Sequence, residues 1–287
     1  DYERGMVKIN SFGYRGREIS VNKPKGVFRI ICIGESTTFG LGCLNNDYTY
    51  PALLEKNLNS AINKPDLRVE VINAGIPSYT SFQCYMLLGL ELLTLQPDLI
   101  IIYTGWNEMG ESLCSTWNID YRYGFMCQQF KEPEKTYLQY VEFFDRSYFI
   151  RRLQRTAFKI RRALAKNLHI RFETEQRLPD YTKSAEFNTC AIAIWKRNII
   201  NMTTLARNHN ADVLFFTWPQ FFYSARQEDI LRSKFTMKGT DFKEKWMQAY
   251  KVYQQELGKI ARDFNVYFFD AASLYLNQDN LLLFWDE

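Results

Sequence analysis

The chain has 287 residues, of which 46% are hydrophobic and 24% are charged, and its formal net charge is +4. These values are typical of a globular protein with one large domain or two small ones. The sequence has only two histidines, and its six cysteines form no Cys-x-x-Cys pair, which excludes a histidine-rich or zinc-finger-like metal site. No apolar run approaches the roughly 18 residues that a membrane-spanning helix needs.

Strand and helix patterns alternate along the chain after residues 1–26, which we expect to form a strap over the domain. Continuous apolar runs, typical of strands buried on both faces, occur at Val27–Ile33, Val69–Ile72, Leu99–Tyr103, Val213–Thr217 and Val266–Phe269. Helical patterns occur at Tyr50–Ala61, Ser81–Leu95, Ala185–His209 and Lys243–Phe264. This alternation predicts a single α/β domain over 1–287, a flavodoxin-like three-layer α/β/α sandwich with a five-stranded parallel sheet.

An insertion, residues 110–187, separates the third strand from the helix that follows. Its second part predicts a basic amphipathic helix over 146–171, with nine Lys or Arg residues and no acidic residue. We interpret this helix either as a solvated face or as a contact with an anionic membrane surface. The chain has no nucleic-acid fold signature, so we expect no nucleic-acid partner. An extracytoplasmic or membrane-associated location is expected.

The first predicted strand ends in Gly34-Glu35-Ser36 and leads into a helix. This arrangement places the Ser36 hydroxyl at the edge of the sheet beside a helix N-terminus, where free N–H groups stabilise an anion. Ser36 is therefore predicted to be a nucleophile, and a role as helix N-cap is the alternative. The segment lacks the Gly-Lys-Ser/Thr ending of a phosphate-binding loop.

The next two strand ends supply candidate hydrogen-bond donors. Gly75 closes the segment Asn73-Ala74-Gly75 and permits close approach of its backbone to a small oxyanion. Asn107, within Gly105-Trp106-Asn107-Glu108, contributes a side-chain amide. Together with the Ser36 N–H group they make three donors of the kind that acyl transfer needs. A turn role for Gly75 and a capping role for Asn107 are the alternatives.

These three segments resemble the first three sequence blocks of the SGNH hydrolases, also called GDSL esterases/lipases. Residues 9–18 are similar to a segment that precedes the first block in one bacterial branch. The resemblance implies that Ser36 is the nucleophile and that Gly75 and Asn107 complete the oxyanion hole. Glu35 and Glu108 stand where the family usually has aspartate, and both keep its charge. The resemblance covers the strands and their order but not the insertion.

The resemblance also implies an aspartate, followed three positions later by a histidine, after the fifth strand. Asp286 has this placement and would orient the histidine, which would fall two residues beyond Glu287. A surface-turn aspartate is the alternative. The apolar run Leu281–Trp285 at the end of the sequence predicts a chain truncated at its C-terminus. A chain that ends at Glu287 would then lack its base and be a poor catalyst.

Neither histidine in the sequence is expected to substitute for that base. His209 follows a helix and precedes the fourth strand, which places it at the amino end of the sheet, and His169 ends the basic helix of the insertion. Histidines at helix C-termini more often interact with the last carbonyl groups.

The predicted function is hydrolysis of carboxylic esters by a Ser-His-Asp site with an oxyanion hole, without a metal or organic cofactor. The substrate would be a small-molecule, glycan or lipid ester, O-acetyl groups included. The alternative is a related protein that binds or transfers an acyl group without hydrolysing it. Cys114 and Cys127 flank an aromatic loop and could form a disulfide in an oxidising compartment, or remain free.

Overall fold

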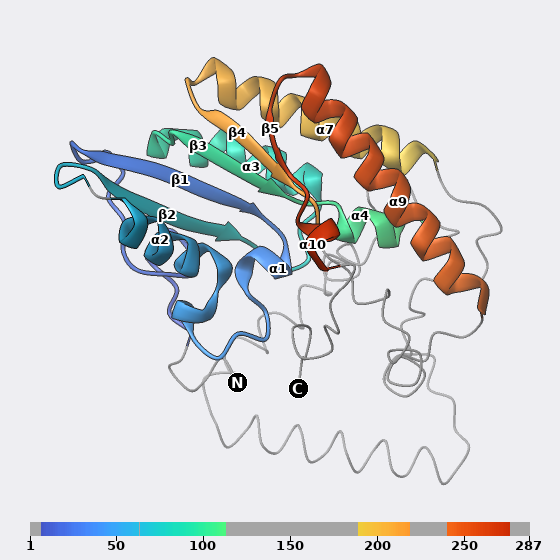
Figure 1. Cartoon of the computed structure of the whole chain (residues 1–287), viewed down its shortest axis with the longest axis horizontal. Helices are drawn as coiled ribbons and strands as arrows, with labels where there is room; N and C mark the ends of the chain where they lie inside the picture. The colour runs from blue at the N-terminus through green and yellow to red at the C-terminus, as the bar shows by residue number, and fades with distance from the viewer. Residues whose placement is uncertain (1–6, 63, 113–188, 219–239, 276–287) are drawn as a thin grey trace, which may run out of the picture.

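Five parallel strands form the centre of the computed structural model, in the order β2-β1-β3-β4-β5 (Figure 1). The structure describes residues 7–62, 64–112, 189–218 and 240–275. The strands are β1 (Val27–Gly34), β2 (Arg68–Gly75), β3 (Leu99–Tyr103), β4 (Asp212–Phe216) and β5 (Tyr267–Phe269). Gly34 pairs with both Gly75 and Tyr103, so the carboxyl ends of the three adjacent strands β2, β1 and β3 lie level.

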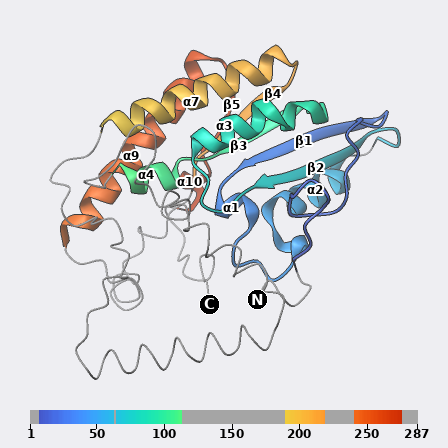
Figure 2. The same ribbon diagram turned by 180° about the vertical axis from the view of Figure 1, so that it is seen from behind.

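Helices cover both faces of this sheet, which confirms the predicted three-layer architecture (Figures 1 and 2). One layer consists of α3 (Ser81–Leu90), α7 (Thr189–Asn208) and α9 (Thr240–Asp263), and α2 (Tyr50–Ala61) lies on the opposite face. The short elements are α1 (Ser36–Phe39), α4 (Trp106–Glu111), α10 (Ala271–Tyr275) and the 3₁₀ segments η2 (Asn46–Tyr48) and η3 (Leu92–Leu95).

The alternation of side chains along each strand divides the core into two clusters. Ile31, Ile33 and Phe215 are fully buried against the layer of α3, α7 and α9. Their neighbours Cys32 and Ile101 point to the other face, toward α2. Because successive side chains of a strand point to opposite faces, continuous apolar runs are needed to bury both.

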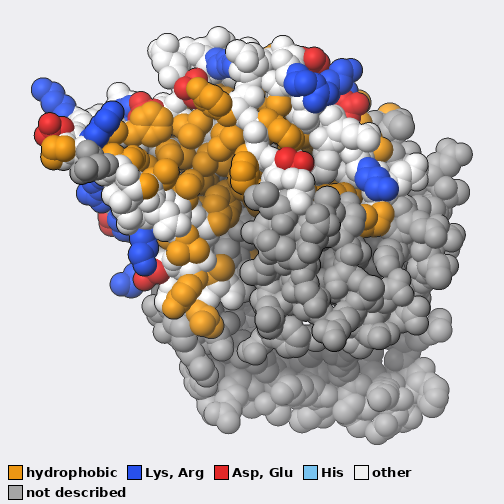
Figure 3. All heavy atoms as spheres, viewed as in Figure 1, with side chains coloured by type: hydrophobic (Ala, Val, Ile, Leu, Met, Phe, Trp, Pro, Cys, Tyr) orange, Lys and Arg blue, Asp and Glu red, His pale blue; other side chains and the backbone are white. Residues whose placement is uncertain are grey.

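The last strand is less buried than its apolar sequence predicts. The side chains of β5, Tyr267, Phe268 and Phe269, are 63%, 41% and 52% exposed. The reason is that β5 is an edge strand, which pairs only with β4 and packs against α9. Figure 3 shows hydrophobic side chains gathered over the face of the sheet beside α2.

The helix predicted over Ser81–Leu95 is interrupted. It ends at Leu90, and Glu91 leaves the helical region with φ −134° before η3 begins. The Glu91 carboxylate accepts a hydrogen bond from the Tyr14 hydroxyl of the strap. This contact joins the strap to the chain at the break between α3 and η3.

Residues 7–26 form ion pairs with α2 and with the amino-terminal parts of the strands. Arg17 pairs with Glu55 of α2 at 3.1 Å and with Glu70 of β2 at 3.0 Å, and Lys23 pairs with Asp98 just before β3. These ion pairs join residues 7–26 to the sheet and to α2, and the strap over residues 1–26 stays a prediction. Within the described part of the chain, no helix has the length and apolar character that crossing a bilayer requires.

Several predictions lie outside the described residues. They concern the insertion from residue 113 onward, its basic helix over 146–171, His169, the pair Cys114 and Cys127, and Asp286.

Candidate active site

Ser36 is the first residue of α1 and lies half-buried at the carboxyl end of β1. Glu35 occupies the N-cap position, so the alternative role of Ser36 as the N-cap is wrong. The chain leaves α1 through Gly40, which has φ +82° in the left-handed region. Its N–H group donates to the carbonyl oxygens of Ser36 at 3.0 Å and of Thr37 at 3.1 Å. The nucleophile candidate therefore sits in a single, tightly closed helical turn.

Gly75 lies directly beneath this turn. A Cβ atom at Gly75 would be 2.2 Å from the Phe39 nitrogen and 2.5 Å from the Thr38 carbonyl carbon, so only glycine allows the contact. The Gly75 N–H group donates to the Asn73 Oδ1 atom at 3.0 Å. An oxyanion bound by the Gly75 N–H group would have to share this group with the Asn73 Oδ1 atom or displace that atom from it. The Asn-x-Gly spacing that produces it is a turn signature that sequence reasoning could have used.

Replacing Gly75 by alanine is expected to destabilise the fold by about 1–3 kcal/mol, because the atoms it would meet are backbone atoms that no rotamer can move. Urea denaturation measures this change. Gly258→Ala is the matched control, since a Cβ there would come no closer than 3.6 Å to its nearest neighbours. That substitution lies inside α9 and should stabilise the protein by about 0.5–1 kcal/mol. Equal effects of the two substitutions would contradict the close approach at Gly75.

Asn107 is the second residue of α4, beside the end of β3. Its side chain does not cap α4; the Nδ2 atom donates to the Tyr79 carbonyl oxygen at 2.6 Å. A primary amide has two N–H groups, so this bond orients the side chain and leaves one donor for a ligand. The backbone N–H group of Asn107 donates to the Glu35 Oε2 atom at 3.1 Å.

Glu35 connects the first and third strand ends. Its carboxylate is 3% exposed and accepts hydrogen bonds from the Thr104 hydroxyl and the Gly105 N–H group, both at 2.7 Å, in addition to the bond from Asn107. Burial, together with repulsion from Glu108, raises the pKa of Glu35 to about 8. The sequence indicated only that Glu35 replaces an aspartate. Its position directly before Ser36, at the end of a strand, was the signal in the sequence that Glu35 could bind the neighbouring strand end.

A second buried carboxylate, Glu108, extends the network to the helix layer. Glu108 is 1% exposed and accepts a hydrogen bond from the Ser81 N–H group at the start of α3. The Ser81 hydroxyl in turn accepts from the Asn198 Nδ2 atom of α7 at 2.9 Å. Glu35 and Glu108, the two glutamates for which the resemblance implies aspartate, therefore each join separate elements around the site.

The structure brings together three of the four predicted site residues, Ser36, Gly75 and Asn107, while Asp286 lies outside the described residues. His209 lies between α7 and the start of β4, as predicted. It is therefore at the amino end of the strands, whereas Ser36 is at their carboxyl end. Over residues 7–62, 64–112, 189–218 and 240–275, no group of three or more His, Cys, Asp or Glu side chains could hold a metal ion.

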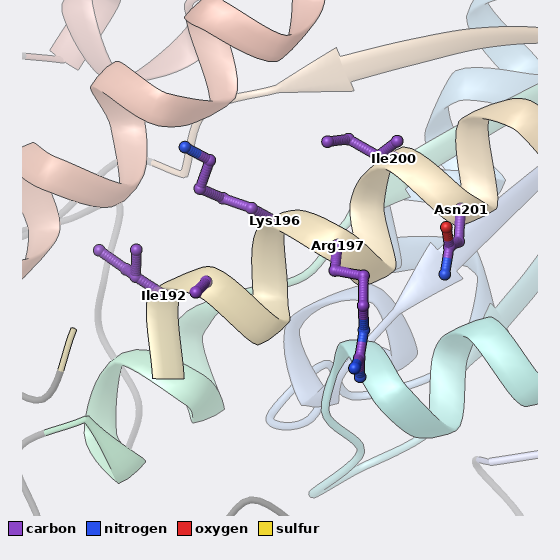
Figure 4. A pocket seen from close by; sticks show the side chains of 6 residues that line it. Ile192, Lys196, Arg197, Ile200 and Asn201 are labelled. Carbon is purple, nitrogen blue, oxygen red and sulfur yellow. The ribbon is translucent and has the colours of Figure 1, made fainter. Parts of the chain in front are cut away.

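A depression on the outer surface of α7 is separate from these strand ends (Figure 4). It is lined only by α7 side chains, and none of them belongs to the hydrogen-bond network around Ser36. The lining residues are Ile192, Ala193, Lys196, Arg197, Ile200 and Asn201.

Comparison with known proteins gives a family match and distant structural similarities. The model of the GDSL-like lipase/acylhydrolase family matches residues 32–286. A catalytic mutant of Axe2, an acetylxylan esterase from Geobacillus stearothermophilus, is 14% identical over 90% of this chain and 80% of its own, with a TM-score of 0.43. A GDSL-like lipase from Bacteroides thetaiotaomicron is 13% identical over 88% and 73%, with a TM-score of 0.41. No curated protein matches the chain.

Proposed function

Because the chain belongs to the GDSL-like lipase/acylhydrolase family, we propose that it hydrolyses carboxylic esters with Ser36 as the nucleophile. The family membership confirms the resemblance carried by the three strand-end segments. The observation that supports the role of Ser36 most directly is its position at the start of α1. This turn packs against Gly75 through Thr38 and Phe39, and Glu35, directly before Ser36, binds the Asn107 N–H group. A nucleophile with donors on two neighbouring strand ends meets the geometric needs of acyl transfer.

In the proposed reaction the Ser36 Oγ atom attacks the ester carbonyl carbon, and the carbonyl oxygen becomes an oxyanion. The N–H groups of Ser36 and Gly75 and the Asn107 amide donate to this oxyanion. The catalytic base takes the hydroxyl proton of Ser36 during the attack and gives it to the departing alcohol. The same base then takes a proton from a water molecule, which attacks the acyl group, and returns the proton to Ser36 as the acid leaves. For Gly75 to take part, its N–H group must turn from the Asn73 side chain or be shared with it.

The base in this proposal is a histidine two positions beyond Glu287, oriented by Asp286. A serine hydroxyl without a base is a weak nucleophile, so activity depends on that histidine. Reading the coding sequence past Glu287 tests this part. Any other residue at the position would remove the Ser-His-Asp mechanism. The proposed substrate class is a small-molecule, glycan or lipid ester.

Labelling with an alkyl fluorophosphonate tests the nucleophile in the full chain. We expect a single labelled serine, identified as Ser36 by mass spectrometry, and no labelling of the Ser36→Ala variant. Ser11→Ala is the matched control, because Ser11 is an exposed serine of the strap that binds Glu18. Undiminished labelling of Ser36→Ala would overturn the assignment. Labelling of Ser36 without release of acid from aryl esters would favour acyl transfer over hydrolysis.

A further inference from the structure

Arg15 of the strap is buried against the turn that closes α1. The side chain is 3% exposed. The Nη1 atom donates to the carbonyl oxygens of Gly40 at 2.6 Å and of Phe39 at 3.3 Å, and the Nη2 atom donates to the Cys43 carbonyl oxygen at 3.1 Å. The Nε atom donates to the Asn46 side chain at 3.1 Å. All four acceptors belong to the segment that follows Ser36.

The partners of Arg15 differ from those of Arg17 and Arg29. Arg17 and Arg29 both bind the Glu70 carboxylate, whereas the described hydrogen bonds of Arg15 all go to neutral oxygens. A buried charge is tolerated only where hydrogen bonds replace its hydration. The planar fork of a guanidinium reaches several carbonyl groups at once, which a lysine ammonium cannot do from one point. Arg15 is thus matched to the shape of this turn.

The turn that Arg15 holds is the one that fixes the Ser36 peptide. The N–H groups of Gly40 and Leu41 donate to the Ser36 carbonyl oxygen at 3.0 and 2.9 Å. Arg15 binds the carbonyl group of Gly40 itself, and its guanidinium carbon lies 5.2 Å from the centroid of the Phe39 ring. Loss of the guanidinium would free the carbonyl groups of this turn and, through them, loosen the hold on Ser36.

We propose that Arg15 is a positioning residue for the nucleophile, through which the strap holds the Ser36 turn in its reactive geometry. This inference rests on the proposed function of Ser36. Misplacement of a reacting group by about 1 Å can lower a rate about 100-fold. We therefore expect Arg15→Met to lower kcat at least about tenfold with little change in KM, because the substrate-binding surface is unchanged. Arg15→Lys should recover part of this loss, since it keeps the charge and one donor.

The experiment compares Arg15→Met and Arg15→Lys with Arg17→Met in the full chain. Hydrolysis of an aryl ester gives kcat and KM, and the rate of fluorophosphonate labelling reports the reactivity of Ser36 alone. Circular dichroism at the assay temperature gives the folded fraction, to which each rate is normalised. Arg17 also fastens the strap but binds Glu55 and Glu70, so Arg17→Met should lower stability and leave the normalised rates within about twofold.

Normalised kcat and labelling rates that are unchanged in Arg15→Met would overturn the proposal and leave Arg15 a purely structural residue. If the Arg15 variants do not fold, Asn46→Ala, which removes one acceptor, provides the same test. A fall in its normalised labelling rate by more than about twofold would support the proposal, and an unchanged rate would refute it. Failure of the proposed function is distinguishable, because Ser36 would then not be labelled in the unmodified protein either.

Discussion

Replacement of Asn107 by alanine is expected to lower kcat by about 10²- to 10³-fold and to change KM little. The amide is proposed to donate to the oxyanion, which carries its full charge only after Ser36 has attacked. An interaction made only in the transition state affects kcat and kcat/KM alike. The backbone N–H group of Asn107, which binds Glu35, is retained in the variant, so the strand end should keep its place.

The same substitution also removes the bond from the Asn107 side chain to the Tyr79 carbonyl oxygen, which should cost about 1 kcal/mol of stability. Asn59→Ala is the matched control. The Asn59 side chain makes three hydrogen bonds, all to the backbone of Glu55 and Val69, so its loss should lower stability but leave kcat unchanged. Steady-state kinetics on an aryl ester and urea denaturation separate the two effects. An Asn107→Ala variant with full kcat would exclude the amide from the oxyanion hole.

Much of the sheet and of the nucleophile segment could be predicted because the relevant signals are local. The helix over Tyr50–Ala61 and the strand over Leu99–Tyr103 match the structure in both bounds. The packing of α1 against Gly75 follows from parallel pairing, in which Gly34 lies opposite Gly75. An apolar run does not reveal whether its strand lies at an edge, which is why the burial of β5 was overestimated.

The contacts that hold the site together could not be predicted, because they join residues far apart in the sequence. Glu35 binds Thr104, Gly105 and Asn107, which lie 69 to 72 positions away. Arg15 binds carbonyl groups 24 to 28 positions away, and nothing in a run of strap residues indicates which arginine will be buried. Arg15 and Arg17 carry the same charge, so the sequence does not show that their roles differ. The difference lies in the acceptors, which are neutral oxygens around Arg15 and carboxylates around Arg17.

The buried Glu35 carboxyl should make stability depend on pH. Its pKa is raised from 4.5 to about 8 in the folded protein, first by burial and then by repulsion from Glu108. A carboxyl group whose pKa is higher in the folded than in the unfolded state stabilises the fold when protonated. Its contribution is complete below about pH 4.5 and is lost as the pH rises toward about 8.

We therefore expect the free energy of unfolding to fall by up to about 1.4 kcal/mol per pH unit within this window, relative to a Glu35→Gln variant. Glutamine keeps one accepting oxygen and carries an NH2 group with two donors in place of the other oxygen, and it does not ionise, so the variant should lack this dependence of stability on pH. Urea denaturation from pH 5 to pH 9 measures the difference, with Glu18→Gln on the exposed strap as the control. Parallel pH profiles for the unmodified protein and Glu35→Gln would show that Glu35 is ionised across the whole range, held by its three donors rather than neutralised by burial.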